Sequence, residues 1–412
     1  MAVKKYWVTL AAFCILLGLA GCQSLSISPP QPIPPGPTQP PVKLTPTTTR
    51  VVMPTLHPSV IPSVTPFIFT LPTPTITPTV TSTPAVVGVF GFSKEIDPLT
   101  GLKPDDPALL ERRPVMVKIS NAPPSVRPQA GLSFADLVFE YYIGEGANRF
   151  MAVFYGKDAR KAGSVRSGRL VDAQLVKMYQ GILAYGSADP QVDQFIDESL
   201  GPRAISNLEA GCPSFCGSSD THESPWIYAN TSEISAYANR KNIDNTRTAL
   251  NGMVFDGTTP NSDQFGVKVG VQYGYARGEW RYDPQSGQYL RWEERNLNPK
   301  DMIPLVDRLN NQQLSFSNVV ILFARYTEFA PTLHDVDIWN NSSGQRAVFF
   351  RDGIMIDGTW RTVDQNQPIQ FFNQYGLPMT LKPGSSWIVL AGLGSQFDQV
   401  EAGHWEMRFH LP

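Results

Sequence analysis

A segment rich in arginine, glycine and serine is the part of the chain whose residue types point most directly to chemistry. Residues 163–169 read Gly-Ser-Val-Arg-Ser-Gly-Arg, and apolar residues at helical spacing follow them. Free backbone N–H groups at the start of a helix attract anions, and guanidinium groups bind phosphate or carboxylate through paired hydrogen bonds. The pattern predicts a pocket for an anion or a glycan carboxylate, formed by Arg166, Ser167 and Arg169, with Arg127 and Arg149 as further candidates.

The same arginines have a second interpretation. Charged residues within apolar strands need partners, and Glu140, Glu145 and Asp172 could pair with these arginines and hold loops in place. Glu140 and Glu145 therefore count among the candidate ligand-binding residues. Ser167 is a poor candidate nucleophile, because no Gly-x-Ser-x-Gly elbow surrounds it and no base can be assigned.

Two cysteines with three residues between them stand in the middle of the chain. If the chain is exported, Cys212 and Cys216 are expected to form a disulfide. The rival interpretation is a metal site with His222, but it lacks a fourth ligand. We expect neither a metal nor a cofactor. Glu140, Glu145 and His222 are the acid–base candidates, but they form no recognisable catalytic set, so catalysis is not the expected role.

The first 22 residues resemble the signal segment of a bacterial lipoprotein. Two lysines precede an apolar run too short to span a bilayer, and the run ends in Leu-Ala-Gly before Cys22. This resembles a lipobox, in which the cysteine thiol is acylated and the chain is cut before it. Two acyl chains anchor a protein stably, so the chain is expected outside the cytoplasm, with Cys22 lipidated and tethered to the cell membrane.

The next segment, residues 23–84, predicts a disordered stalk. It contains 17 prolines, and Lys43 and Arg50 carry its only charges. Proline removes a backbone donor and fixes φ, so such a segment favours extended polyproline II over helix or sheet. The stalk would hold the remaining chain away from the membrane.

The sequence of the remaining residues, 85–412, predicts an α+β protein in two parts. Residues 85–250 mix strand and helix patterns, which predicts an α/β lobe. Residues 251–412 show alternating strands and turn signals, among them a hairpin around Asp283–Gly287, which predicts a mainly antiparallel β lobe. Residues 85–412 hold 30 basic and 36 acidic side chains without a basic stripe, so nucleic acid is not expected as a partner.

Several ordered motifs resemble the YerB-like lipoprotein family of bacteria, a domain of unknown function with N- and C-terminal regions. The resemblance spans roughly residues 95–392 and implies a lipid-anchored envelope protein with an α/β part and a β-rich part, without implying an activity. The motifs are Asp97–Gly101, Arg113–Val117, Arg127–Asp136, Glu145–Phe150, Gly163–Arg169, Phe350–Gly353, Gly358–Arg361 and Leu381–Ile388.

These observations favour a binding module at the cell surface. Its expected partner is an anionic cell-wall or envelope polymer, or an envelope protein. An envelope hydrolase or transferase and an assembly scaffold remain as alternatives.

Overall fold

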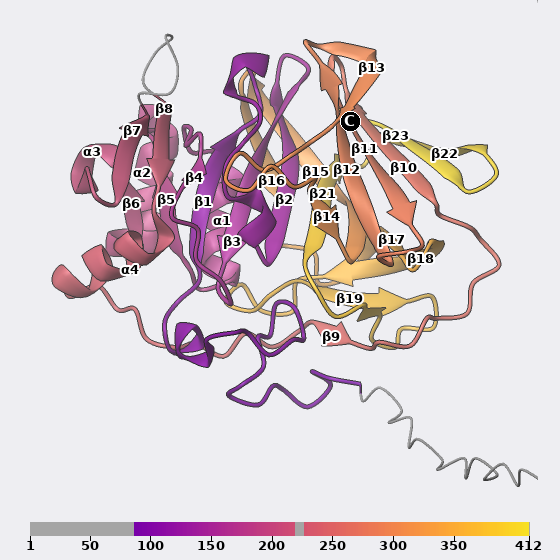
Figure 1. Ribbon diagram of the computed structural model, residues 1–412, viewed down its shortest axis with the longest axis horizontal. Helices are drawn as coiled ribbons and strands as arrows, with labels where there is room; N and C mark the ends of the chain where they lie inside the picture. The colour runs from indigo at the N-terminus through magenta and orange to yellow at the C-terminus, as the bar shows by residue number, and fades with distance from the viewer. Residues whose placement is uncertain (1–85, 219–225, 412) are drawn as a thin grey trace, which may run out of the picture. The chain divides into compact units, whose positions relative to one another are not determined.

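Strands from both halves of the chain form the largest sheet (Figure 1). The computed structural model describes residues 86–218 and 226–411, which belong to the unit Pro78–Pro412. The sheet runs in the order β19 (Gln370–Asn373), β18 (Ile354–Arg361), β17 (Gln345–Arg351), β15 (Asn318–Ala330), β21 (Ser386–Gly392), β2 (Leu137–Gly144), β3 (Ala147–Phe154), β1 (Val115–Ser120), β5 (Ile182–Tyr185) and β6 (Ala204–Ser206), and β16 (Leu333–Asp337) pairs with β15.

Strand β21 joins the two halves. It lies between β2 and β15 and runs parallel to both, so Ser386 pairs with Leu137 on one side and with Asn318 on the other. Every residue of β21 is buried, as expected for a parallel strand covered on both faces. The sheet therefore continues across the boundary expected near residue 250, and the division into an α/β lobe and a β lobe stays a prediction.

A second sheet contains the predicted hairpin and is built mainly from antiparallel pairs. The turn at Asp283–Gly287 connects two of its strands, so that Asp283 pairs with Gln288. Its order is β13 (Asn298–Pro304), β12 (Gln288–Arg295), β11 (Ala276–Asp283), β10 (Lys268–Tyr273), β23 (His404–Arg408) and β22 (Gln396–Glu401), with β14 (Ser315–Phe316) paired to β12.

The remaining elements are short. The α-helices are α1 (Leu170–Met178), α2 (Pro190–Leu200), α3 (Asn207–Ala210) and α4 (Thr231–Arg240), and the 3-10 helices are η1 (Pro107–Glu111), η2 (Pro124–Val126), η3 (Leu132–Phe134) and η4 (Gly201–Arg203). One small sheet has the order β4 (Ala162–Gly163), β8 (Trp226–Ala229) and β7 (Phe215–Ser218). Another small sheet pairs β20 (Thr380–Leu381) with β9 (Val254–Phe255). The described part is thus mostly β with few helices.

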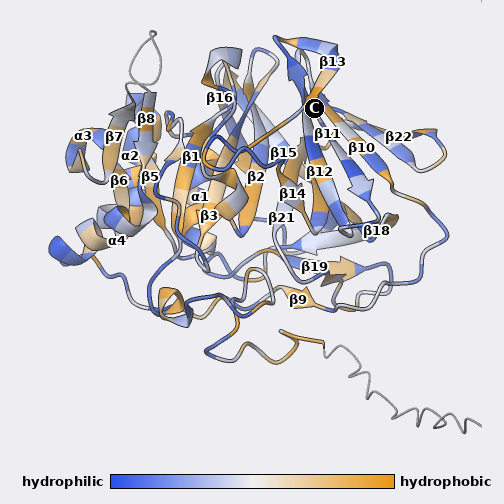
Figure 2. Ribbon diagram, viewed as in Figure 1, coloured by the Kyte–Doolittle hydropathy of each residue, from blue (hydrophilic) through white to orange (hydrophobic). Residues whose placement is uncertain are grey.

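The two faces of the large sheet carry separate layers of buried side chains. Figure 2 shows apolar residues gathered on β1, β2, β3 and α1. Successive side chains of a strand point to opposite faces, so Phe139 and Tyr141 pack with residues of α1 while Val138 packs with residues of the second sheet. This alternation decides which polar side chains of the central strands can meet.

Some predictions fall outside the described residues. They are the signal segment with Cys22, the stalk as far as residue 84, and His222. Within the described ranges, no helix combines the length and apolar character that crossing a bilayer requires.

Candidate functional site

A lysine, a tyrosine and an aspartate meet in the interior between the large sheet and α1. Lys118 of β1 and Tyr141 of β2 point to the face that α1 covers, and Asp172 comes from the first turn of α1. The Lys118 ammonium donates to the Tyr141 hydroxyl, which in turn donates to Asp172, and Lys118 Nζ lies 3.2 Å from Asp172 Oδ1. All three side chains are fully buried, so this polar network satisfies itself without solvent.

The same aspartate closes the first turn of α1. The other carboxylate oxygen, Asp172 Oδ2, accepts the backbone N–H of Arg169 at 2.7 Å. A carboxylate three residues after the cap satisfies one of the free donors at a helix start. Both oxygens of Asp172 are thereby occupied by groups of the protein.

Two arginines line a cavity of about 280 Å³ beside this helix start. Arg149 of β3 pairs with Tyr141 across the sheet, which places it on the α1 face, and only 9% of it is exposed. Arg149 Nη1 donates to the carbonyl of Ser167 at 2.9 Å, and Arg169 Nη1 donates to the carbonyl of Gly168 at 2.9 Å. Carbonyls orient these guanidinium groups without neutralising them.

Positive charge exceeds negative charge around this cavity. We call Lys118, Arg149, Arg166 and Arg169 the cationic cluster. In the described part of the chain, Asp172 forms an ion pair with one member of this cluster, Lys118. Burial, with Arg169 and Arg166 adding to it, lowers the pKa of Arg149 to about 9. Burial also lowers the pKa of Lys118 to about 7. The charge of Asp172 acts to raise this pKa, whereas the charges of Arg149 and Arg169 lower it further. A bound anion would relieve this repulsion.

The rest of the cavity is mostly apolar and aromatic. Ile143, Leu297 and Tyr275 contribute walls, and Glu145 and Thr332 contribute polar groups. Glu145 is exposed in the turn between β2 and β3. The cavity therefore has a cationic end at the two arginines and a largely apolar remainder.

The structure brings together most, but not all, of the residues predicted for the anion pocket. Arg149 and Arg169 line the cavity, Ser167 supplies a carbonyl to it, and Arg166 is exposed close to Arg149. Arg127 is used elsewhere, where its guanidinium contacts Glu293 at 2.9 Å and Glu294 at 2.8 Å in β12.

Glu140 lies on the opposite face of β2 from Tyr141. Its carboxylate accepts from Asn148 Nδ2 at 2.6 Å and from Trp387 Nε1 at 2.7 Å, and it lies 3.3 Å from Arg291 Nη2. Burial raises its pKa, and its side chain has no exposure. Glu140 is therefore a structural link between the two sheets and is not positioned for acid–base chemistry in a cleft.

Sequence reasoning missed Lys118 and Tyr141, although a signal was present. Lys118 interrupts the apolar run of β1, where an unpaired charge would be costly, so a buried partner is required. The cysteine prediction is confirmed, since Cys212 and Cys216 form a disulfide with Cα atoms 4.7 Å apart.

Two family models match the chain. "Protein of unknown function (DUF3048) N-terminal domain" matches residues 99–244, and the DUF3048 C-terminal domain matches residues 269–388. The chain belongs to the DUF3048 family. The expected family resemblance is thus confirmed. The four residues of the cationic cluster lie in the N-terminal DUF3048 match, and Tyr275 and Thr332 lie in the C-terminal one.

A relative and a solved structure extend this comparison. "Putative lipoprotein YerB" of Bacillus subtilis (strain 168) is 26% identical over 307 residues, which cover 71% of this chain and 84% of the relative. The crystal structure of YerB protein from Bacillus subtilis covers 72% of this chain and 96% of its own, with a TM-score of 0.59 and 24% identity. At that identity, the structural similarity supports the DUF3048 fold alone.

Proposed function

We propose that this protein is a lipid-anchored, extracytoplasmic binding protein that captures a small anionic group of the cell envelope in the cavity beside the start of α1. The charge imbalance of the cationic cluster carries this proposal. Two arginines face the cavity with carbonyl partners, and the nearby carboxylate of Asp172 is already used by Lys118, Tyr141 and the Arg169 backbone. Guanidinium groups in such a setting bind phosphate or carboxylate strongly.

The location of the protein is part of this proposal. The lipobox-like residues before Cys22 support a lipid anchor, and the relative from Bacillus subtilis bears the name of a lipoprotein. The proline-rich segment that follows would allow the binding cavity to reach envelope polymers at a distance from the membrane.

Binding is better supported than hydrolysis or transfer. Of the acid–base candidates, Glu140 is buried in its pair with Arg291, and Glu145 is exposed in a turn at the rim of the cavity. The two carboxylates do not converge, since Glu140 belongs to the opposite face of the sheet.

Isothermal titration of the full chain with inorganic phosphate and with glucuronate tests the proposal. Phosphate represents a phosphoryl group and glucuronate a glycan carboxylate, so the two titrations separate the two sources of the anion. Because a hydrogen bond to a charged group contributes roughly 1.5–3 kcal/mol, Arg149→Gln and Arg169→Gln should each weaken binding about tenfold or more. Added salt should weaken binding by the wild type as well.

Arg346→Gln is the matched control. Arg346 is an arginine of β17 paired with Asp357 on the surface, so this variant removes the same charge away from the cavity. It should leave the anion affinity unchanged. The proposal fails if the wild type binds neither anion, or if the two cavity variants bind as the control does.

A further inference from the structure

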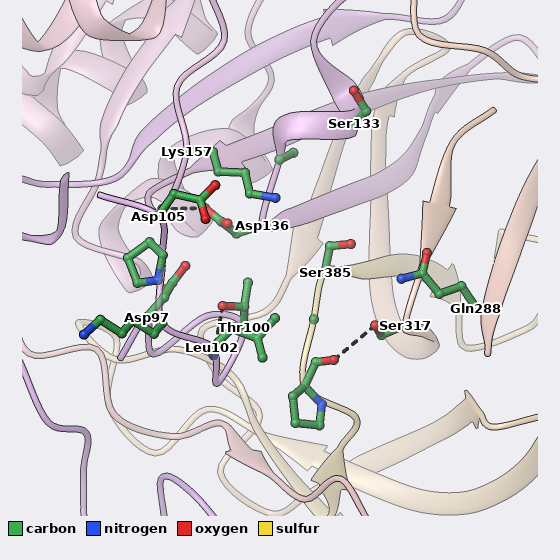
Figure 3. A pocket seen from close by; sticks show the side chains of 16 residues that line it. Asp97, Thr100, Leu102, Asp105, Ser133, Asp136, Lys157, Gln288, Ser317 and Ser385 are labelled. Carbon is green, nitrogen blue, oxygen red and sulfur yellow. Dashed lines mark hydrogen bonds between the residues drawn. The ribbon is translucent and has the colours of Figure 1, made fainter. Parts of the chain in front are cut away.

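A second cavity, of about 340 Å³, lies where six separated segments of the chain meet. Figure 3 shows Asp97, Asp136 and Lys157 on one side of it and Gln288, Ser317 and Ser385 on the other. Residues from the motifs Asp97–Gly101, Arg127–Asp136 and Leu381–Ile388 contribute to its walls. It shares no lining residue with the cavity of the cationic cluster.

Two buried carboxyl groups face each other at this cavity. Asp136 Oδ2 accepts the backbone N–H groups of Tyr155 at 2.6 Å and Gly156 at 3.0 Å, and Asp97 Oδ1 accepts that of Leu99 at 2.8 Å. The other two oxygens, Asp97 Oδ2 and Asp136 Oδ1, both lie beside Gly156, at 2.7 and 3.4 Å from the position of an added Cβ. Any other residue at position 156 would therefore collide with the pair.

The pKa values of both carboxyl groups lie above their ordinary range. Burial is the main cause that raises the pKa of Asp97 well above its ordinary value, and the charge of Asp136 is the second. Burial also raises the pKa of Asp136, to about 6. Two carboxylates at this separation cannot both ionise readily. The pair thus offers carboxyl oxygens on the wall of the cavity.

The charges around this cavity come close to balance, unlike those of the cationic cluster. Two lysines, Lys103 and Lys157, line the cavity together with the three aspartates Asp97, Asp105 and Asp136, and Lys103 also contacts Glu95 at 2.7 Å. No excess of positive charge is present to attract an anion. An uncharged ligand fits this setting, since it requires no counter-ion.

The opposite wall supplies hydroxyl and amide groups. Ser317 donates its hydroxyl to the carbonyl of Pro383 at 3.2 Å. Ser133, on the segment that leads to Asp136, donates its hydroxyl to Asp307 at 2.7 Å and accepts from Asn310 Nδ2 at 3.1 Å. A hydroxyl that has donated still offers lone pairs as acceptors. Gln288 adds an amide, which both donates and accepts. The cavity therefore carries both donors and acceptors.

We infer that this cavity is a second binding site, which takes one unit of an uncharged saccharide. A sugar ring carries adjacent hydroxyl groups that each donate and accept, and these match carboxyl oxygens, an ammonium and hydroxyls on facing walls. The volume is in the range of small-molecule sites. The inference does not depend on anion binding at the cationic cluster.

Ligand-observed saturation-transfer NMR and isothermal titration with N-acetylglucosamine and with methyl glucoside test this inference on the full chain. Lys157→Met and Gln288→Ala are the main variants, because neither side chain supports a buried backbone group. Each should weaken saccharide binding about tenfold, the loss expected for one hydrogen bond of roughly 1.4 kcal/mol. Arg149→Gln, at the other cavity, should leave saccharide affinity unchanged.

Other results of these binding measurements would contradict a saccharide site. The inference is overturned if the wild type gives no saturation transfer from either sugar, or if Lys157→Met and Gln288→Ala bind as the wild type does. It is also overturned if only a cationic amino sugar such as glucosamine binds, since the site would then select charge rather than hydroxyl groups.

Discussion

At the scale of single residues, the paired carboxyl groups of Asp97 and Asp136 make stability depend on pH. A carboxyl whose pKa is raised in the folded state binds more protons there than in the unfolded chain, so its contribution is present at low pH and is lost as pH rises through the raised pKa. For Asp136 the window runs from its ordinary value of 3.8 to about 6. The free energy of unfolding of the wild type should therefore fall across this window.

Asp97→Asn should abolish most of that dependence. The asparagine amide can donate to Asp136 without adding a second charge, and its carbonyl can still accept from Leu99 N–H. At pH 7 the variant should be more stable than the wild type by on the order of 1–3 kcal/mol. Urea unfolding from pH 4 to pH 8 measures this, and parallel pH profiles for the two proteins would contradict it.

Residue spacing explains which site residues could be predicted. Arg166 and Arg169 stand in one short motif, and Arg149 stands in another that precedes it, so their meeting at a helix start was readable from the sequence. Asp97 and Asp136 left no such signal, because each resembles an ordinary turn carboxylate until burial brings them together. Glu140 was grouped with Arg149 although strand register places Tyr141, and not Glu140, opposite that arginine.

At the scale of elements, the pair Glu140 and Arg291 connects β2 of the large sheet to β12 of the second sheet. Both side chains are fully buried, and the Arg291 guanidinium lies 4.2 Å from the ring centre of Trp280 and 4.9 Å from that of Trp387. Removing one partner of a buried pair leaves an uncompensated charge. Arg291→Met should therefore cost about 3 kcal/mol of unfolding free energy.

A second variant and a control make this measurement specific. Adding Glu140→Gln to Arg291→Met removes the stranded charge and should recover most of the loss. Arg346→Gln removes an exposed partner of Asp357 and should cost less than about 1 kcal/mol. Equal losses for Arg291→Met and Arg346→Gln in urea unfolding would show that the buried pair does not link the sheets.

At the scale of elements, helices and turns were easier to predict than the pairing of strands. The helical spacing after residue 169 and the turn at 283–287 both appear in the structure, as α1 and as the connection between β11 and β12. The pairing of β21 with β2 left no local pattern, since an all-apolar strand is compatible with many neighbours. The two-part division at residue 250 rests on local patterns alone and stays a prediction.

At the scale of the whole molecule, the N-terminal half should not fold without the C-terminal half. Residues 86–250 alone would leave the edge of β2 unpaired and expose the buried faces that β21 and the second sheet cover. We expect this fragment to lack a cooperative thermal transition in circular dichroism and to elute as aggregate, whereas residues 86–412 should melt cooperatively. A sharp transition of the short fragment would contradict this expectation.

The position of β21 also sets an order of events for the growing polypeptide. Trp387 reaches Glu140 across 247 positions of sequence, so the strand that completes the centre of the sheet is among the last to be synthesised. A chain interrupted anywhere before residue 386 would retain an open sheet edge and remain a substrate for proteases. The cavity of about 340 Å³, which Pro383, Gly384 and Ser385 help to line, likewise forms only after these late residues have been added.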